Sequence, residues 1–292
     1  RDLPKLVKSM GQTACAITDH GVMYGAIDFY RACKAEGIKP IIGCEVYVAP
    51  RTRFDKEHAF DREAYHLVLL CENETGYRNL SYMVSRGYLD GFYNRPRVDM
   101  ELLREHHEGI IALSACLAGR VPQALLHDQY EEAKKAALEY AEIFGPEHFY
   151  LELQDHGLEE QPRVNQGILR LSQETGLPLV VTNDAHYLRR EDARTQDILM
   201  CIQMGKTVDD PNRLKFETEE FYLKSEEELR ERFPQADEAF ENTVKIAERC
   251  NVEFTFGKYH LPEFKLPAGY DSLTYLKELC TKGFAERYGE EH

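Results

Sequence analysis

The chain has 292 residues, 43% of them hydrophobic, enough for one large domain with its own core or for such a domain and the start of another. Its 36 Lys and Arg residues are outnumbered by 51 Asp and Glu, and a net charge of −15 argues against the segment being the main contact with a nucleic acid. Because no run approaches the roughly 18 apolar residues of a membrane span and no signal peptide is recognisable, we expect a soluble, cytoplasmic protein without a membrane partner.

Short apolar runs alternate with amphipathic stretches, a pattern typical of strand-helix units in an α/β fold with a parallel sheet or barrel. The predicted strands are 14–18, 40–48, 66–71, 109–114, 148–153 and 177–182. The helices predicted between them are 24–36, 75–88, 130–144 and 161–174. Three more helices, 191–204, 225–233 and 236–250, are predicted after the last strand. The charged insert 52–63 is predicted to be a surface loop.

The pattern also indicates a domain boundary. We expect a barrel domain over residues 1–255, then a linker over 256–270, which lacks periodicity and is rich in proline and glycine toward its end. Residues 271–292, with a predicted helix at 272–288, are expected to begin the next domain. Since the sequence starts without Met and ends on a polar run, we expect it to be a fragment of a longer protein.

Residues of metal-binding type recur where the strands end, and in a parallel barrel these carboxyl ends meet at the active site. His20 closes the first strand, Glu45 lies in the second and Cys116 follows the fourth. Asp184 and His186 follow the sixth strand, and residues two apart in extended chain point to the same side, so both can reach one cation. These positions predict a metal site.

His66 is a less regular candidate because it opens its strand, and we attribute this to a misplaced strand boundary. Each candidate also has a structural interpretation: Asp184 can cap a following helix, His20 can be a hydrogen-bonded histidine, and Cys116 can be a small buried hydrophobe. Convergence on neighbouring strand ends favours ligation. Cys44 is assigned to the core, with Glu45 facing the site.

Other polar groups carry weaker signals. His106 and His107 lie at a polar helix end and are predicted to be solvated, whereas Asp155 and His156 are predicted to form a turn after a strand, with lining of the site as the less favoured alternative. The stretch 95–97 is interpreted as a structural loop rather than a phosphate contact.

A ligand set of imidazole, carboxylate and thiolate suits Zn, Mn or Fe better than Mg or Ca. Two or three such cations can bind a phosphate ester and activate water, so phosphoester hydrolysis is the predicted reaction class. No nucleophile elbow, Walker loop or dinucleotide fingerprint competes with this interpretation.

The order of motifs resembles that of PHP domains, the polymerase and histidinol phosphatase family. The motifs are TDHG at 18–21, GCE at 43–45, YHL at 65–67, SAC at 114–116 and NDAH at 183–186. Longer stretches, such as KPIIGCEVYV at 39–48 and GFYNRPRVD at 91–99, are similar to the PHP domains of bacterial DNA polymerase III alpha subunits, the replicative C-family polymerases.

The resemblance implies a distorted seven-stranded β/α barrel that binds up to three divalent metal ions in its complete form. The ligands carried over are His20, Glu45, His66, Cys116, Asp184 and His186, with catalytic roles for His20, Glu45, Asp184 and His186. The family's first motif, an HxH with a downstream Asp, is expected to precede Arg1, so the first strand is expected to be missing. The catalytic aspartates of the polymerase palm are expected beyond residue 292.

Two roles are implied for such a domain: a metal-dependent 3′ to 5′ exonuclease, or a non-catalytic scaffold that stabilises the polymerase and docks a proofreading subunit. The implied partners are DNA, through other domains, and the holoenzyme subunits, namely the proofreading subunit, the sliding clamp and the clamp loader. A stand-alone phosphatase of the histidinol phosphatase type is the remaining alternative.

Overall fold

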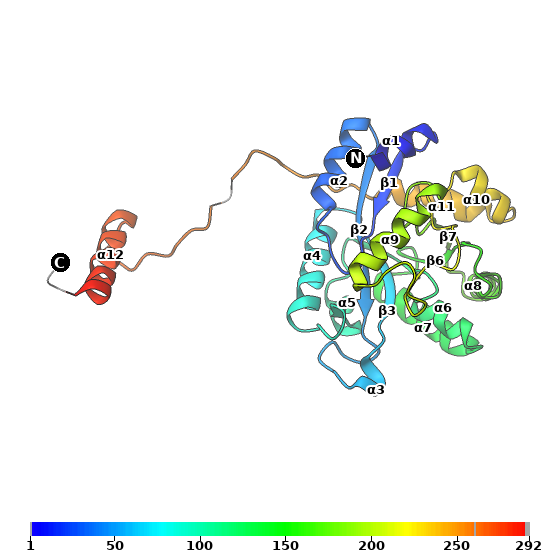
Figure 1. Cartoon of the computed structure of the whole chain (residues 1–292), viewed down its shortest axis with the longest axis horizontal. Coiled ribbons are helices and arrows are strands. Elements are labelled where there is room, and N and C mark those ends of the chain that lie inside the picture. Colours follow the sequence, from blue (N-terminus) through cyan, green and yellow to red (C-terminus); the bar gives the residue numbers. More distant parts are fainter. Residues whose placement is uncertain (1, 260, 290–292) are drawn as a thin grey trace. The chain divides into compact units, whose positions relative to one another are not determined.

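The structure is a computed structural model that describes residues 2–259 and 261–289. It comprises two compact units, with the division between Glu253 and Phe254. In the first unit the strands lie at the centre and helices surround them (Figure 1), which confirms the predicted α/β class. The second unit contains one described helix, α12 Ser272–Tyr288, which begins at a capping box formed by Asp271 and Thr274.

The strands of the first unit form one sheet in the order β1-β2-β3-β5-β6-β7, and β4 pairs with β2 outside this path. Their bounds are β1 Ala14–Ile17, β2 Lys39–Val48, β3 Tyr65–Cys71, β4 Arg97–Val98, β5 Ile110–Leu113, β6 Phe149–Leu153 and β7 Leu179–Val181. The sheet is parallel as expected except at one strand, because β3 pairs antiparallel with both β2 and β5.

The direction of β3 also corrects our explanation of His66. The predicted strand began within one residue of the observed start at Tyr65, so the boundary was not misplaced. An antiparallel strand starts at the edge where its parallel neighbours end. His66 therefore lies at the same edge of the sheet as the other candidate ligands although it opens its strand.

The helices of the first unit occur between and after the strands. They are α1 Asp2–Ser9, α2 Ala26–Glu36, α3 His58–Asp61, α4 Glu74–Leu89, α5 Met100–Glu105, α6 Arg120–Leu126, α7 Tyr130–Phe144, α8 Gln161–Thr175, the 3₁₀ turn η1 Arg190–Asp192, α9 Ala193–Met204, α10 Glu226–Arg232 and α11 Asp237–Arg249. The predicted segments 24–36, 75–88, 130–144 and 161–174 correspond to α2, α4, α7 and α8. The short helices α1, α3, α5 and α6 were not predicted, because few turns give little periodicity.

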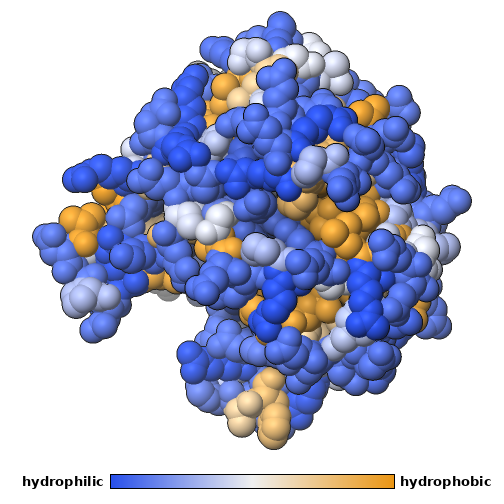
Figure 2. All heavy atoms as spheres, turned by 90° about the vertical axis from the view of Figure 1, so that its right-hand side faces the viewer, coloured by the Kyte–Doolittle hydropathy of each residue, from blue (hydrophilic) through white to orange (hydrophobic). Residues whose placement is uncertain are grey.

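The main core joins the sheet to the last helix of the unit. Its buried cluster draws apolar side chains from β2, β3, β5, β6 and β7, and Ile246 and Cys250 extend it to α11 and the residue that follows. No described helix combines the length and apolar character that a membrane crossing requires. The face seen in Figure 2 is mostly hydrophilic with smaller apolar groups, as the high charge content leads one to expect.

The insert 52–63 is not a simple surface loop. It contains α3, and its Asp61 is fully buried in an ion pair with Arg51. Arg97 is also fully buried and donates to the backbone carbonyls of Gly91, Asp61, Arg53 and Asp55. One guanidinium thereby fixes the path of the insert beside the sheet.

Candidate metal centre

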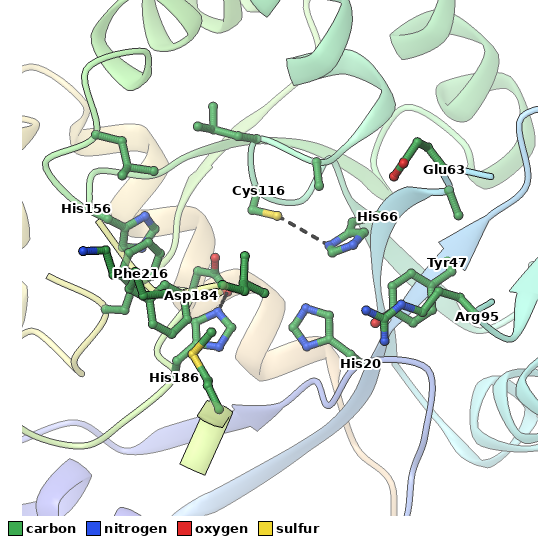
Figure 3. A pocket seen from close by; sticks show the side chains of 18 of the residues that line it. His20, Tyr47, Glu63, His66, Arg95, Cys116, His156, Asp184, His186 and Phe216 are labelled. Carbon is green, nitrogen blue, oxygen red and sulfur yellow. Dashed lines mark hydrogen bonds and ion pairs between the residues drawn. The ribbon is translucent and has the colours of Figure 1, made fainter. Parts of the chain in front are cut away.

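The strand ends meet at a cavity of about 1020 Å³. Five of the six predicted ligands line it: His20, His66, Cys116, Asp184 and His186. Figure 3 shows the rings of His20, His66 and His186 and the carboxylate of Asp184 turned toward a common space. Glu45 is 4% exposed and reaches this group from the wall.

Glu45 and His66 come together through the register of β2 and β3. His66 pairs with Tyr47, two residues beyond Glu45, so the two side chains are diagonal neighbours on one face. Nδ1 of His66 lies 2.6 Å from Oε1 of Glu45. The ring of Tyr47 packs edge-on against His66, with 5.1 Å between ring centroids.

His20 joins them because the chain after β1 continues alongside β2. His20 forms a parallel bridge with Glu45, and its Nε2 lies 3.5 Å from Oε2 of that carboxylate. Burial lowers the pKa of His20, and the Glu45 charge offsets this only in part. Gly21 completes the turn at a φ of +67°, where a Cβ would lie 2.9 Å from Pro96 and 3.0 Å from Tyr47. The glycine of the TDHG motif is therefore required by the local packing.

Cys116 enters from the end of β5. Its Sγ lies 3.6 Å from Nδ1 of His66 and 3.7 Å from Oε1 of Glu45. Burial raises the pKa of the Cys116 thiol well above its usual value, and the charges of Glu45 and Asp184 raise it further. A bound cation reverses this effect by favouring the thiolate. Cys44, predicted to belong to the core, is fully buried.

Asp184 and His186 form the opposite side of the group. Nε2 of His186 lies 3.4 Å from Oδ1 of Asp184, and the ring centroids of His186 and His20 are 5.8 Å apart. Burial disfavours the charge on both groups. Their mutual hydrogen bond and attraction outweigh it, so the pKa of Asp184 is lowered and that of His186 is raised. The structure thus brings all six predicted side chains into one group.

The donor set fits a divalent cation. One ligand atom each from His20, Glu45 and His66 lies within 4.8 Å of the others. The buried carboxylate of Glu45 has the imidazoles of His20 and His66 and the thiol of Cys116 as neighbours. Borderline nitrogen donors and a soft sulfur donor thus lie around one carboxylate. These three residues are therefore suited to hold a divalent metal.

Three aromatic residues line the cavity beside the ligand group: Phe216 and Phe221, which carried no signal in the sequence, and His156, which carried a weak one. The rings of His156 and Phe221 stack at 4.3 Å, and Phe216 contacts both Phe221 and His186. Both ring nitrogens of His156 are engaged, Nε2 with the Asn183 carbonyl at 2.7 Å and Nδ1 with Gln161 at 2.8 Å. His156 is thus part of the cavity wall as well as of the turn predicted for it.

The wall also carries cations, although the chain as a whole is acidic. Arg62, Arg95 and Lys215 line the cavity, with Glu63 as an acidic neighbour. The guanidinium of Arg95 lies 5.5 Å from the ring centroid of Tyr47, beside His20 and His66 (Figure 3). The two arginines of the stretch 95–97 therefore have different roles. Arg97 is structural, as predicted, whereas Arg95 faces the cavity. Such a wall is suited to an anion.

Comparison with known proteins places these features in a family. Residues 1–156, more than half of the chain, match the PHP domain family. The chain is 49% identical over 288 residues to DNA polymerase III subunit alpha of Treponema pallidum (strain Nichols), covering 98% of this chain and 25% of that protein. It is 46% identical over 298 residues to the subunit of the same name from Thermus aquaticus, covering 99% of this chain and 24% of that protein.

The chain thus spans about a quarter of the length of these relatives. The resemblance inferred from the motifs is confirmed by both comparisons, and the sheet with its surrounding helices agrees with it. The chain belongs to the PHP domain family.

Proposed function

We propose that this chain is the PHP domain of a bacterial DNA polymerase III alpha subunit, and that its cavity is a divalent metal centre that hydrolyses phosphodiester bonds at the 3′ end of DNA. The observation that carries the proposal is the convergence of six ligand-type side chains on a cavity with cations on its wall. The similarity to relatives named DNA polymerase III subunit alpha supports the identity of the longer protein.

The metal ions proposed are Zn, Mn or Fe ahead of Mg, with up to three in the complete domain. His20, Glu45, His66 and Cys116 would hold one side of the cluster, and Asp184 and His186 the other. When bound, such ions supply Lewis acidity toward a phosphoryl group and make a nearby water more acidic. Among the proposed catalytic residues, Glu45 and Asp184 would supply negative charge, and His20 and His186 would orient the reacting groups.

The wall supports a polymeric substrate. A cavity of about 1020 Å³ exceeds the space that a metal cluster alone requires. Arg95 and Lys215 lie on this wall, where they can contact phosphates next to the one being cleaved. Polymerisation and most DNA binding are assigned to other parts of the longer chain, in keeping with the charge of −15.

In this proposal residues 1–255 form the PHP barrel, 256–270 a linker and 271–292 the start of the palm region. The protein acts in the cytoplasm with the proofreading subunit, the sliding clamp and the clamp loader as partners of the whole polymerase.

The proposed function can be tested with the full-length polypeptide, meaning the longer polymerase chain proposed to contain this domain. The assay measures the release of 3′ nucleotides from a 5′-labelled single strand of DNA. Without nucleotide triphosphates, we expect release that requires Mn²⁺ or Zn²⁺ and is stopped by a chelator. Asp184→Asn should remove it, because Asp184 belongs to the proposed ligand set. Asp128→Asn is the matched control, since Asp128 is an exposed carboxylate paired with Arg163. Metal-dependent release that survives Asp184→Asn would refute the proposal.

A further inference from the structure

Glu152 is a buried carboxylate that neither the motifs nor the proposed chemistry uses. It lies on β6, between the strands that precede Cys116 and Asp184, and is 4% exposed. A buried carboxylate is costly unless several donors satisfy it. Its contacts therefore indicate why the fold retains it.

The two oxygens of Glu152 bind the ends of the two neighbouring strands. Oε2 accepts a short hydrogen bond from the backbone N–H of Ala115, just after β5. Oε1 accepts from the hydroxyl of Thr182, just after β7, at 2.7 Å, and from Nε2 of Gln154 at 3.3 Å. The backbone N–H of Glu152 also donates to Oγ of Ser114 at 2.8 Å. One side chain thus connects three adjacent strand ends.

Both tethered segments lead directly to ligands. Ala115 precedes Cys116 and is buried with a φ of +66°, a conformation that an L-residue holds only when its surroundings enforce it. Thr182 lies two residues before Asp184, whose own φ is +43°. The hydrogen bonds from Ala115 and Thr182 hold these two unusual turns at a fixed separation across β6.

We infer that Glu152 is a positioning residue: its carboxylate sets the separation of Cys116 and Asp184 and thereby the affinity of the site for metal. The inference rests on the proposed metal centre, although not on its nuclease activity. Groups that orient metal ligands commonly contribute 10- to 100-fold in metal affinity. Glu152 acts through the backbone at Ala115 and through the Thr182 hydroxyl, and takes no ligand position itself.

Glu152→Gln provides the test because it keeps the shape and removes one acceptor. The amide NH₂ must then face either the Ala115 N–H, which cannot accept a hydrogen bond, or the Thr182 hydroxyl and Gln154 Nε2, where the hydroxyl must change from donor to acceptor and Nε2 of Gln154 loses its acceptor. In Co²⁺ titrations of the full-length polypeptide, we expect the thiolate-to-cobalt absorption of Cys116 to weaken and the affinity to fall by about 10- to 100-fold. Cys116→Ser identifies that absorption band.

Asp99→Asn is the matched control. Asp99 is a buried carboxylate that accepts from Arg53 and from the Leu102 backbone, and it does not line the cavity. A loss of stability alone would be common to both variants. We expect Asp99→Asn to lower the unfolding temperature and to leave Co²⁺ affinity and the thiolate band unchanged.

Thr182→Val is the second variant, in case Glu152→Gln does not fold. It removes one donor to Glu152 and keeps the β-branched shape, so a several-fold loss of Co²⁺ affinity is expected. Wild-type affinity and an intact thiolate band in both variants, or equal losses in Asp99→Asn, would overturn the inference. Binding of Co²⁺ without any 3′ nucleotide release contradicts the proposed hydrolysis but leaves the role of Glu152 standing. Absence of Co²⁺ binding in the wild type contradicts both.

Discussion

Nδ1 of His66 and Oε1 of Glu45 lie 2.6 Å apart because β3 runs antiparallel to β2 and places the start of one strand beside the end of the other. The pair holds an imidazole and a buried carboxylate at the centre of the ligand group. Its contribution can be measured through the stability of the folded protein, since a ligand that binds only the native state stabilises it by mass action.

For this pair, we expect Mn²⁺ added to chelator-treated protein to stabilise the wild type by about 2.7 kcal/mol at a free concentration 100 times Kd. Glu45→Gln should abolish most of this gain, because the amide is a poor metal ligand. Glu63→Gln changes an exposed carboxylate of the same cavity and should keep the gain. Thermal unfolding with and without Mn²⁺ measures the effect, and a full gain in Glu45→Gln contradicts the proposed role of Glu45.

Arg95→Ala should lower the activity toward a DNA strand and leave the activity toward a small phosphate ester unchanged. If Arg95 contacts a phosphate beyond the scissile one, kcat/KM for a single-stranded oligonucleotide falls about tenfold, equivalent to ~1.4 kcal/mol. Hydrolysis of bis(p-nitrophenyl) phosphate, which has no second phosphate, should not change. Arg78→Ala, at an exposed position paired with Glu74 on α4, is the control. Equal losses on both substrates contradict a strand contact.

Gly21→Ala should destabilise the protein more than Gly11→Ala. Both glycines have positive φ, +67° and +74°, but a Cβ at Gly21 meets Pro96 and Tyr47 whereas one at Gly11 has nothing within 4 Å. We expect a cost of ~1 kcal/mol at Gly11 from the backbone alone and about 2–4 kcal/mol at Gly21. Urea denaturation measures the difference. Equal losses of stability in the two variants would show that Tyr47 and Pro96 move aside without cost, and would contradict the steric argument.

Lys224→Met should change how stability depends on pH. Lys224 is 1% exposed, and burial, reinforced by the Arg232 charge, lowers its pKa to about 8. Because the folded-state pKa is depressed, the native protein binds fewer protons than the unfolded chain between about pH 8 and the ordinary lysine pKa near 10.4. The free energy of unfolding therefore rises with pH through that window. Below the window Lys224 is charged in both states, and the full cost of burying its charge remains.

The variant lacks this titration. Relative to Lys224→Met, the wild type should gain on the order of 1 to 3 kcal/mol between pH 7.5 and pH 10, measured by denaturant unfolding at each pH. A difference between the two proteins that is independent of pH contradicts the depressed pKa.

Much of the fold was predictable because its long elements carry strong patterns. The predicted segments 130–144 and 272–288 coincide with α7 and α12, since several turns of periodic burial or a good cap mark both ends. Strand direction was not predictable for β3. A buried strand shows the same apolar run whichever way it points, and only its partners fix the direction.

The residues of the site likewise include some that the sequence predicts and some that it does not. The six ligand-type residues were found because their chemistry recurs at strand ends, whereas Phe216 and Phe221 belong to an irregular segment whose position depends on contacts with His186 and Asn183. Arg95 lies just before β4 and Arg97 is the first residue of that strand, yet one is exposed and the other buried. No local pattern distinguishes them. Glu152 is a single carboxylate in an apolar strand, and its partners became visible only with the three strand ends side by side.

The reversed direction of β3 has a consequence for how this site can diversify. A parallel strand would require the chain after β2 to cross to the far edge of the sheet, usually through a helix. Here the connection from Val48 to Tyr65 begins and ends at the cavity rim, and it contributes His58, Arg62 and Glu63 to the wall. Insertions, deletions or exchanges in this connection can reshape the entrance while the register of the sheet and the ligand positions stay as they are. The exposed residues of this connection, such as Arg62 and Glu63, are thus positions at which substrate selection can change independently of the metal ligands.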